Sequence, residues 1–158
     1  LSSMLFDAKR NGRGQIFSEA ELDHHFYLLD VRGTIKAALK VFGEDPNNYL
    51  ALRPLGLAAR IYYNLRDYSE DVNAGRINIS AEDCERFGIG RDNLEDRLST
   101  NVCSWFKNQA VIGLAYLSEH RLLFRREKFS TLTRIVLPIV YERPTDRYFR
   151  RVLSEVEE

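Results

Sequence analysis

Three carboxylates lie within one helical turn in the stretch from Tyr62 to Arg76, which reads YYNLRDYSEDVNAGR. They are Asp67, Glu70 and Asp71. Like charges at this spacing repel one another and destabilise a helix, so a purely structural role explains them poorly. Mg²⁺ takes oxygen ligands, usually one or two carboxylates together with substrate phosphates and water. The spacing therefore favours a hard-cation site, with these three acids as the metal ligands.

Two arginines, Arg66 and Arg76, flank the three acids. A guanidinium group can bind a pair of phosphate oxygens, so the mixture of acids and arginines suits a substrate that carries phosphate or diphosphate. Such a cluster would neutralise a diphosphate leaving group electrostatically. The alternative is an ordinary surface helix laced with salt bridges, and spacing alone leaves both interpretations open.

A helix that starts near Asn48 is expected to carry these residues. On it, Arg60, Asn64, Asp67 and Asp71 follow one another at intervals of four, three and four, which places them on one polar face. A solvated face is the alternative interpretation of that stripe. An earlier helix contains Gly33 in its interior, at a cost of roughly 1 kcal/mol relative to alanine, which predicts close approach of another helix or of a ligand.

The remaining pattern is helical throughout, because apolar residues recur at intervals of three and four and alternation with period two is absent. The sequence predicts an all-α protein with one domain over 1–158. Capping serines at 18, 80 and 130 mark three helix starts. Expected helices cover 1–10, about 19–42, from near 48 through 72, 80–87, about 92–98, about 100–127, and a last one kinked near Pro138 and separated from a terminal segment by Pro144.

Composition excludes several classes of protein. The chain has 158 residues, 44% of them hydrophobic, and 23 basic residues balance 23 acidic ones, so the overall charge gives no reason to expect nucleic acid as a partner. The two cysteines, Cys84 and Cys103, are too few for a disulfide framework and are expected to be free thiols. No apolar run approaches the ~18 residues of a membrane span. A cytoplasmic location is the resulting expectation.

Other motifs of catalytic chemistry are missing from the sequence. His24 and His25 are adjacent and point about 100° apart on a helix, so they cannot form a shared two-ligand site. There is no HExxH, no Ser-His-Asp order and no glycine loop for phosphate. The second acidic string, DNLED from Asp92 to Asp96, is better explained by acids at the start of a helix, where they favour the macrodipole.

The stretch from Asn64 to Arg76, NLRDYSEDVNAGR, resembles the second aspartate-rich motif of squalene and phytoene synthases, R-D-x-x-E-D followed after a short gap by Gly-Arg. One helix earlier, the stretch from Tyr27 to Thr34 resembles the family's Tyr-x-x-x-Val-x-Gly-Thr. Met4 and Asp7 resemble a Met-x-x-Asp pair of the family. The resemblance extends over nearly the whole chain, and its specific part is the aspartate-rich motif.

The resemblance implies an isoprenoid-synthase-like helical bundle in which two acidic motifs face each other across a cavity, with Mg²⁺ between them. Family members join two prenyl diphosphates head to head, and squalene-forming members also use NADPH. For this chain it implies that Asp67, Asp71 and Arg76 are catalytic. It implies five substrate-binding residues, which are Arg66, Asn64, Tyr63, Gly33 and Arg60.

The chain also departs from the family pattern. The first acidic motif is expected upstream of Leu1, so the chain corresponds to a C-terminal portion without the N-terminal helices. Tyr63 stands where the family has Asn, and Arg32 and Lys36 stand where small residues are usual. These departures keep open a catalytically inactive scaffold or assembly factor, and a helical interaction module without a ligand. Expected partners are a prenyl diphosphate, the N-terminal half or a second copy, and a membrane surface contacted peripherally.

Overall fold

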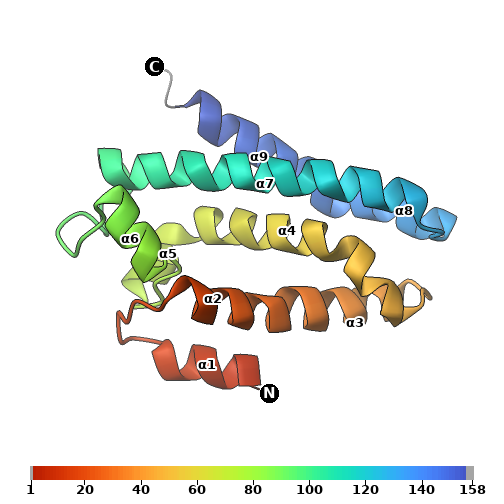
Figure 1. Ribbon diagram of the computed structural model, residues 1–158, viewed down its shortest axis with the longest axis horizontal. Helices are drawn as coiled ribbons and strands as arrows, with labels where there is room; N and C mark the ends of the chain where they lie inside the picture. The colour runs from red at the N-terminus through yellow and green to blue at the C-terminus, as the bar shows by residue number, and fades with distance from the viewer. Residues whose placement is uncertain (1, 156–158) are drawn as a thin grey trace.

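The computed structural model describes residues 2–155, and all regular elements within them are helical (Figure 1). The all-α prediction is confirmed. The α-helices are α1 (Ser2–Arg10), α2 (Glu19–Phe26), α3 (Lys36–Val41), α4 (Arg53–Arg66), α5 (Tyr68–Asn73), α6 (Ala81–Phe87), α7 (Thr100–Arg126), α8 (Thr131–Leu137) and α9 (Arg143–Ser154). Two π-helices, η1 (Tyr27–Ile35) and η3 (Pro138–Glu142), and one 3-10 helix, η2 (Pro46–Leu52), complete them.

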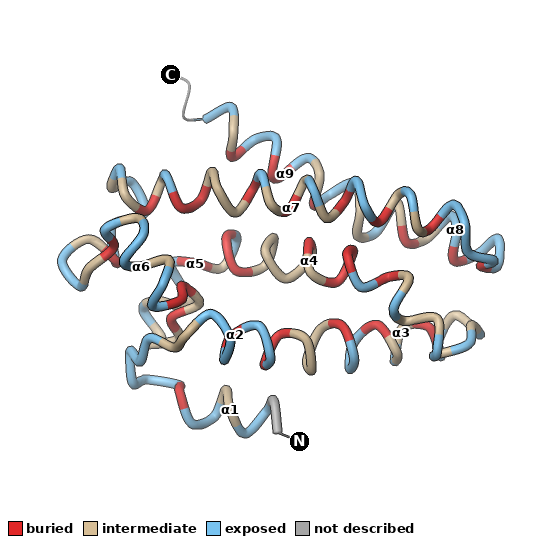
Figure 2. Tube along the Cα trace, viewed as in Figure 1, coloured by how far each residue is buried: buried red, intermediate tan, exposed pale blue. Residues whose placement is uncertain are grey.

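Helix α4 occupies the middle of the bundle. On one side it packs against η1, which joins α2 and α3 into one long rod, and on the other side it packs against α7. Helix α9 covers α7, and α1 lies outside α2 (Figure 1). Buried residues lie along both sides of α4 and along the side of α7 that faces α4 (Figure 2). The candidate site on α4 is therefore held between two helical layers.

The three predicted serine caps are confirmed. The Ser18 hydroxyl accepts from the backbone N–H of Glu21, and the Glu21 carboxylate accepts from the backbone N–H of Ser18. These two bonds form a capping box. The hydroxyls of Ser80 and Ser130 likewise accept from the backbone N–H groups of Asp83 and Thr133, without the reciprocal bond of a capping box. These side-chain bonds satisfy N–H groups that a helix start leaves without partners, which explains why short-range sequence signals identified them.

The close approach of another helix predicted at Gly33 is wrong, and the alternative of a close ligand stays a prediction. Gly33 is exposed in η1, and a Cβ placed there would meet only the Leu28 carbonyl of its own helix, at 3.1 Å. The close approach occurs instead at Gly56 of α4, where a Cβ would lie 2.7 Å from Cδ1 of Ile35. Gly56 therefore leaves room for the Ile35 side chain of η1 to lie against the α4 backbone.

Three predicted boundaries are also corrected. Residues 46–52 form a 3-10 helix capped by Asp45, so α4 begins only at Arg53. Residues 92–98 form turns because the side chains of Asn93 and Asp96 accept hydrogen bonds from nearby backbone N–H groups. Pro144 does not separate two segments, since it lies in the first turn of α9, where a missing N–H costs little.

The cysteines are free and half-buried, as expected. None of the helices between residues 2 and 155 is both long enough and apolar enough to span a membrane.

Candidate functional site

The predicted helix breaks at Asp67, in the middle of the aspartate-rich motif. Asp67 has φ −94° and ψ 10°, which ends α4 and starts α5. The next residue, Tyr68, is buried, and its hydroxyl donates to the Leu94 carbonyl oxygen at 2.6 Å. Burial raises the pKa of Tyr68 to about 12. The prediction of one continuous polar face through Asp71 is therefore wrong, because α5 turns to bury Tyr68.

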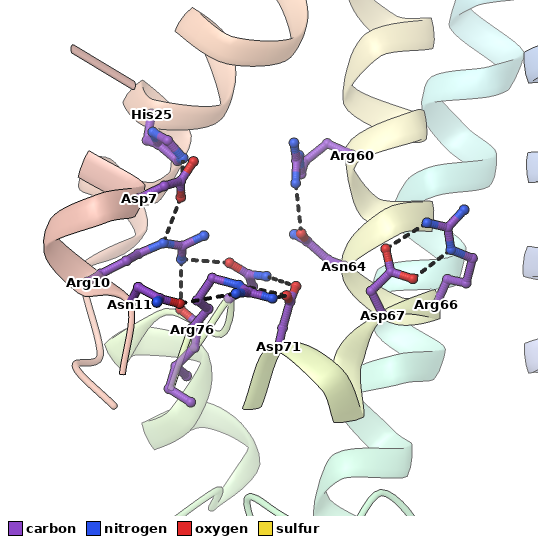
Figure 3. A network of polar contacts seen from close by, with 12 residues as sticks. Asp7, Arg10, Asn11, His25, Arg60, Asn64, Arg66, Asp67, Asp71 and Arg76 are labelled. Atoms are coloured by element: carbon purple, nitrogen blue, oxygen red, sulfur yellow. Dashed lines mark hydrogen bonds and ion pairs between the residues drawn. The ribbon is translucent and has the colours of Figure 1, made fainter. Parts of the chain in front are cut away.

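Asp67 forms a bidentate ion pair with its neighbour in sequence. Nε and Nη2 of Arg66 donate to the two carboxylate oxygens, each at 2.7 Å (Figure 3). The guanidinium also lies over the Tyr63 ring, 4.7 Å from its centroid. The hydrogen bonds to Asp67 raise the pKa of Arg66. Arg66 and Tyr63 thus form a stacked pair beside the first aspartate of the motif.

Asp71 belongs to a larger network (Figure 3). Arg76 donates to Oδ1 of Asp71 from Nε and Nη2, at 3.0 and 2.7 Å, and Asn78 donates to Oδ2 at 2.8 Å. Arg76 also donates to Asn11 at 3.1 Å, and Arg10 donates to Asn78 at 2.7 Å. Through Arg76 and Asn78, Asp71 therefore links α5 to the end of α1 and to the start of the loop after α1.

Gly75 allows that loop to lie against the motif. It has φ +68°, and a Cβ placed there would be 2.8 Å from the carbonyl carbon of Gly12. The Gly12 N–H donates to the Ala74 carbonyl at 2.8 Å, and the Gly14 N–H donates to Gly75 at 3.1 Å. The glycines at 12 and 14 thus serve this contact as well as ending the first helix, a role that the sequence analysis missed.

Arg60 and Asn64 face a polar cavity of about 200 Å³ between α2, α4, α6 and α7. Arg60 donates to both carboxylate oxygens of Asp30, at 2.6 and 2.8 Å, and more weakly to Asn64 at 3.4 Å. Asn64 is only 9% exposed. The cavity is lined by Glu19, Leu22, Asp23, Phe26, Leu57, Arg60, Ile61, Asn64, Asn78, Ser80, Asp83, Trp105, Gln109, Ile112 and Tyr116.

Tyr63 faces a different, apolar cavity of about 120 Å³ between η1, α4 and η3. Asp30 lines the apolar cavity and Arg60 lines the polar one, so their ion pair lies between the two. Burial raises the pKa of Tyr63. The apolar cavity is lined by Asp30, Thr34, Ile35, Ala38, Leu52, Leu55, Gly56, Ala59, Tyr63, Leu137 and Tyr141.

The three acids do not form a metal site as they stand. Asp67 and Asp71 both accept hydrogen bonds from guanidinium groups, and Glu70 is exposed. In the part of the chain that the structure describes, no three His, Cys, Asp or Glu side chains lie close enough together to hold a metal ion. A divalent cation at this motif would therefore compete with the arginines for the two aspartate carboxylates.

The structure separates the candidate residues into three groups and leaves Gly33 and the exposed Glu70 apart from all of them. The groups are Arg60 with Asn64, Tyr63 with Arg66 and Asp67, and Asp71 with Arg76. Asp30 and Asn78 were missed as members, although a carboxylate inside the apolar run YLLDV was a usable signal for Asp30. Comparisons with protein-family models, curated proteins and solved structures find no match to this chain.

Proposed function

We propose that this chain is part of a prenyltransferase of the squalene/phytoene synthase type and that its apolar cavity holds part of a prenyl chain. The observation that carries the proposal is the order of residues along α4. Gly56, Ala59 and Tyr63 line the cavity at intervals of three and four, and Asp67 follows Tyr63 after four more residues. The aspartate-rich motif therefore begins where the cavity-lining face of α4 ends.

The walls of this cavity suit a hydrocarbon. Aliphatic and small side chains predominate in its lining, and the one carboxylate, Asp30, is paired with Arg60. Transfer of a prenyl chain from water to such walls is favourable by roughly 25 cal/mol per Å² of apolar surface. The volume is below the roughly 300 Å³ at which pockets enclose a whole drug-sized ligand. The cavity would take one segment of a prenyl chain.

Arg66 is the side chain best placed for the diphosphate end. Its guanidinium fork already holds two carboxylate oxygens of Asp67, and a phosphate presents oxygens in a similar geometry. A diphosphate at this end would compete with Asp67 for Arg66. Mg²⁺ at Asp67, Glu70 and Asp71 remains a prediction from the resemblance, as does NADPH, and the binding proposed here does not depend on either.

Calorimetry with farnesyl diphosphate tests the cavity. The variant Ala59→Trp fills the apolar cavity and is expected to weaken binding at least about tenfold, whereas Ala115→Trp, on the exposed side of α7, should leave it unchanged. Circular dichroism would verify that both variants fold. Inorganic diphosphate should bind more weakly than the prenyl compound and should be indifferent to Ala59→Trp. Equal binding of farnesyl diphosphate to the parent and to a folded Ala59→Trp would overturn the proposal.

A catalytically inactive scaffold is the second candidate, and a specific observation favours it. Both motif aspartates are neutralised by arginines, and the chain holds no group of three metal-ligating side chains within its described part. Turnover of prenyl diphosphates by the intact gene product, abolished by Asp67→Asn, would exclude the scaffold.

A further inference from the structure

An apolar stripe runs along the outer side of α8 and η3. Four large apolar side chains there are each more than half exposed, and they are Leu132, Ile135, Ile139 and Val140. The first three recur at intervals of three and four, so they share one side of the helical segment. Thr133 and Leu137 on the opposite side are buried. The segment therefore has two apolar sides, one buried in the bundle and one facing away from it.

Cations flank this stripe along the chain, and one of them, Arg134, also donates to the carbonyl oxygens of Glu127 and Phe129. The segment 125–143 holds five basic and two acidic residues, and its exposed cations are Arg125, Arg126, Lys128, Arg134 and Arg143. Of the two acids, Glu142 accepts from Arg121 at 2.6 Å, which leaves Glu127 as the exposed one. A third acid, Glu44, lies at the start of α8, where it accepts from Ser130 and Thr133. The five cations still outnumber these acids, whereas the whole chain has a formal net charge of zero.

We propose that α8 and η3 form a contact surface for an anionic lipid bilayer, with the apolar stripe in the headgroup region and the cations on the phosphates. The charge pattern selects this partner. An apolar helix side bordered by Arg and Lys is the composition of segments that lie in the interface without crossing it. Anionic lipids attract such cations, whose aliphatic stems can remain among the apolar side chains while the charged ends reach the headgroups.

The position of the segment fits this contact. The turn from α7 into α8 lies at one end of the long axis of the molecule, where α8 forms an outer edge (Figure 1). Most residues of α8 are exposed (Figure 2), while its buried residues face other parts of the bundle, Thr133 toward Glu44 and Leu137 toward the apolar cavity beside α4. The same segment also contributes Leu137 and Tyr141 to the wall of the apolar cavity, but none of the stripe residues or the five cations lines it, so the surface can be tested separately from the proposed function.

Vesicle sedimentation tests the surface. The parent chain is expected to bind vesicles of mixed phosphatidylcholine and phosphatidylglycerol at least about tenfold more tightly than vesicles of phosphatidylcholine alone, and added salt should weaken that binding. Equal binding to both kinds of vesicle would overturn the electrostatic part of the proposal, and binding to neither would overturn it entirely.

Matched variants locate the contact. The double variants Ile135→Ser/Ile139→Ser and Arg125→Glu/Arg126→Glu should each reduce binding to the anionic vesicles at least about tenfold. The controls Leu98→Ser and Arg91→Glu change exposed residues in the turns before α7 and should bind as the parent does. If the controls lose as much binding as the test variants, the surface is wrong. Concentration-dependent association through Ile135 and Ile139 without vesicle binding would assign the stripe to a second copy and also overturn the proposal.

Discussion

The two aspartates of the motif are chemically identical but differ in their hydrogen-bond partners. Asp67 bonds to the adjacent Arg66, and both side chains are substantially exposed, at 33% and 46%. Asp71 is 19% exposed and joins α5, the following loop and the end of α1 through Arg76 and Asn78. The Arg66–Asp67 pair joins only neighbouring residues, whereas the Asp71 network holds separate elements of the tertiary structure together. A ligand would therefore exchange partners with Asp67 more easily than with Asp71.

Gly75→Ala should cause the largest loss of stability, because it disturbs the contact between the loop after α5, which belongs to the Asp71 network, and the loop after α1. The left-handed backbone conformation costs an alanine about 1–2 kcal/mol, and its Cβ would also clash with the backbone at Gly12. We expect a loss of about 3 kcal/mol in the free energy of unfolding, measured by urea denaturation. Gly43→Ala is the control, since Gly43 also has positive φ but open space around its Cβ. Equal losses in the two variants would contradict a role for the Gly12 contact.

The stabilities of the aspartate variants should be compared above pH 6.5, because below that value protonation of His120 adds its own pH dependence. Burial lowers the pKa of His120 to about 4, whereas in the unfolded chain it is near 6.5. The unfolded chain then binds the proton more readily, so stability should fall as pH decreases from 6.5 toward 4, by about 2 kcal/mol at pH 5. His120→Leu should flatten the pH dependence of unfolding in this window. An unchanged slope in that variant would assign the pH dependence to other groups.

Asp71→Ala should destabilise the chain by about 1–2 kcal/mol, because Arg76 and Asn78 both lose their acceptor in a partly buried place. Glu70→Ala is the matched control, an exposed acid one position earlier whose removal should change stability by less than about 0.5 kcal/mol. Thermal or urea unfolding of both variants measures the difference. If Glu70→Ala were as damaging as Asp71→Ala, the network would not be the cause.

Asp67→Ala should have the smallest effect, a loss of about 0.5 kcal/mol or less, because exposed ion pairs contribute little to stability. The effect should shrink further at high salt, where such pairs are screened. Unfolding at low and high salt measures both quantities. A loss as large as that of Asp71→Ala would show that the two aspartates share one structural role.

The sequence correctly predicted those structural features that depend only on residues close together in the chain. The serine caps and the long helix α7 follow from bonds and periodicity within a few residues, and both were found at the expected places. The break at Asp67 was missed because no glycine or proline marks it. Its cause is Tyr68, whose ring packs against Phe106 with centroids 5.2 Å apart. A contact with a residue 38 positions away leaves no local signal.

The candidate site shows the same limit. Spacing identified the acids and arginines of the motif, but their partners lie far away in sequence. Asn11 reaches Arg76, and Asp30 reaches Arg60. Likewise, periodicity alone did not show that Gly56, rather than Gly33, is where two helices come close together. Long-range partners decide which polar residues become a site and which become a structural support.

The ion pair between Asp30 and Arg60 couples the two cavities. Asp30 lines the apolar cavity and Arg60 lines the polar one, so each side chain is neutralised by a partner that lines the other cavity. Replacing Arg60 with a small residue would leave the Asp30 carboxylate in the wall of the apolar cavity without its cation, and a partly buried charge without a partner is costly. A substitution that changes what one cavity accepts therefore also changes the electrostatics of the other.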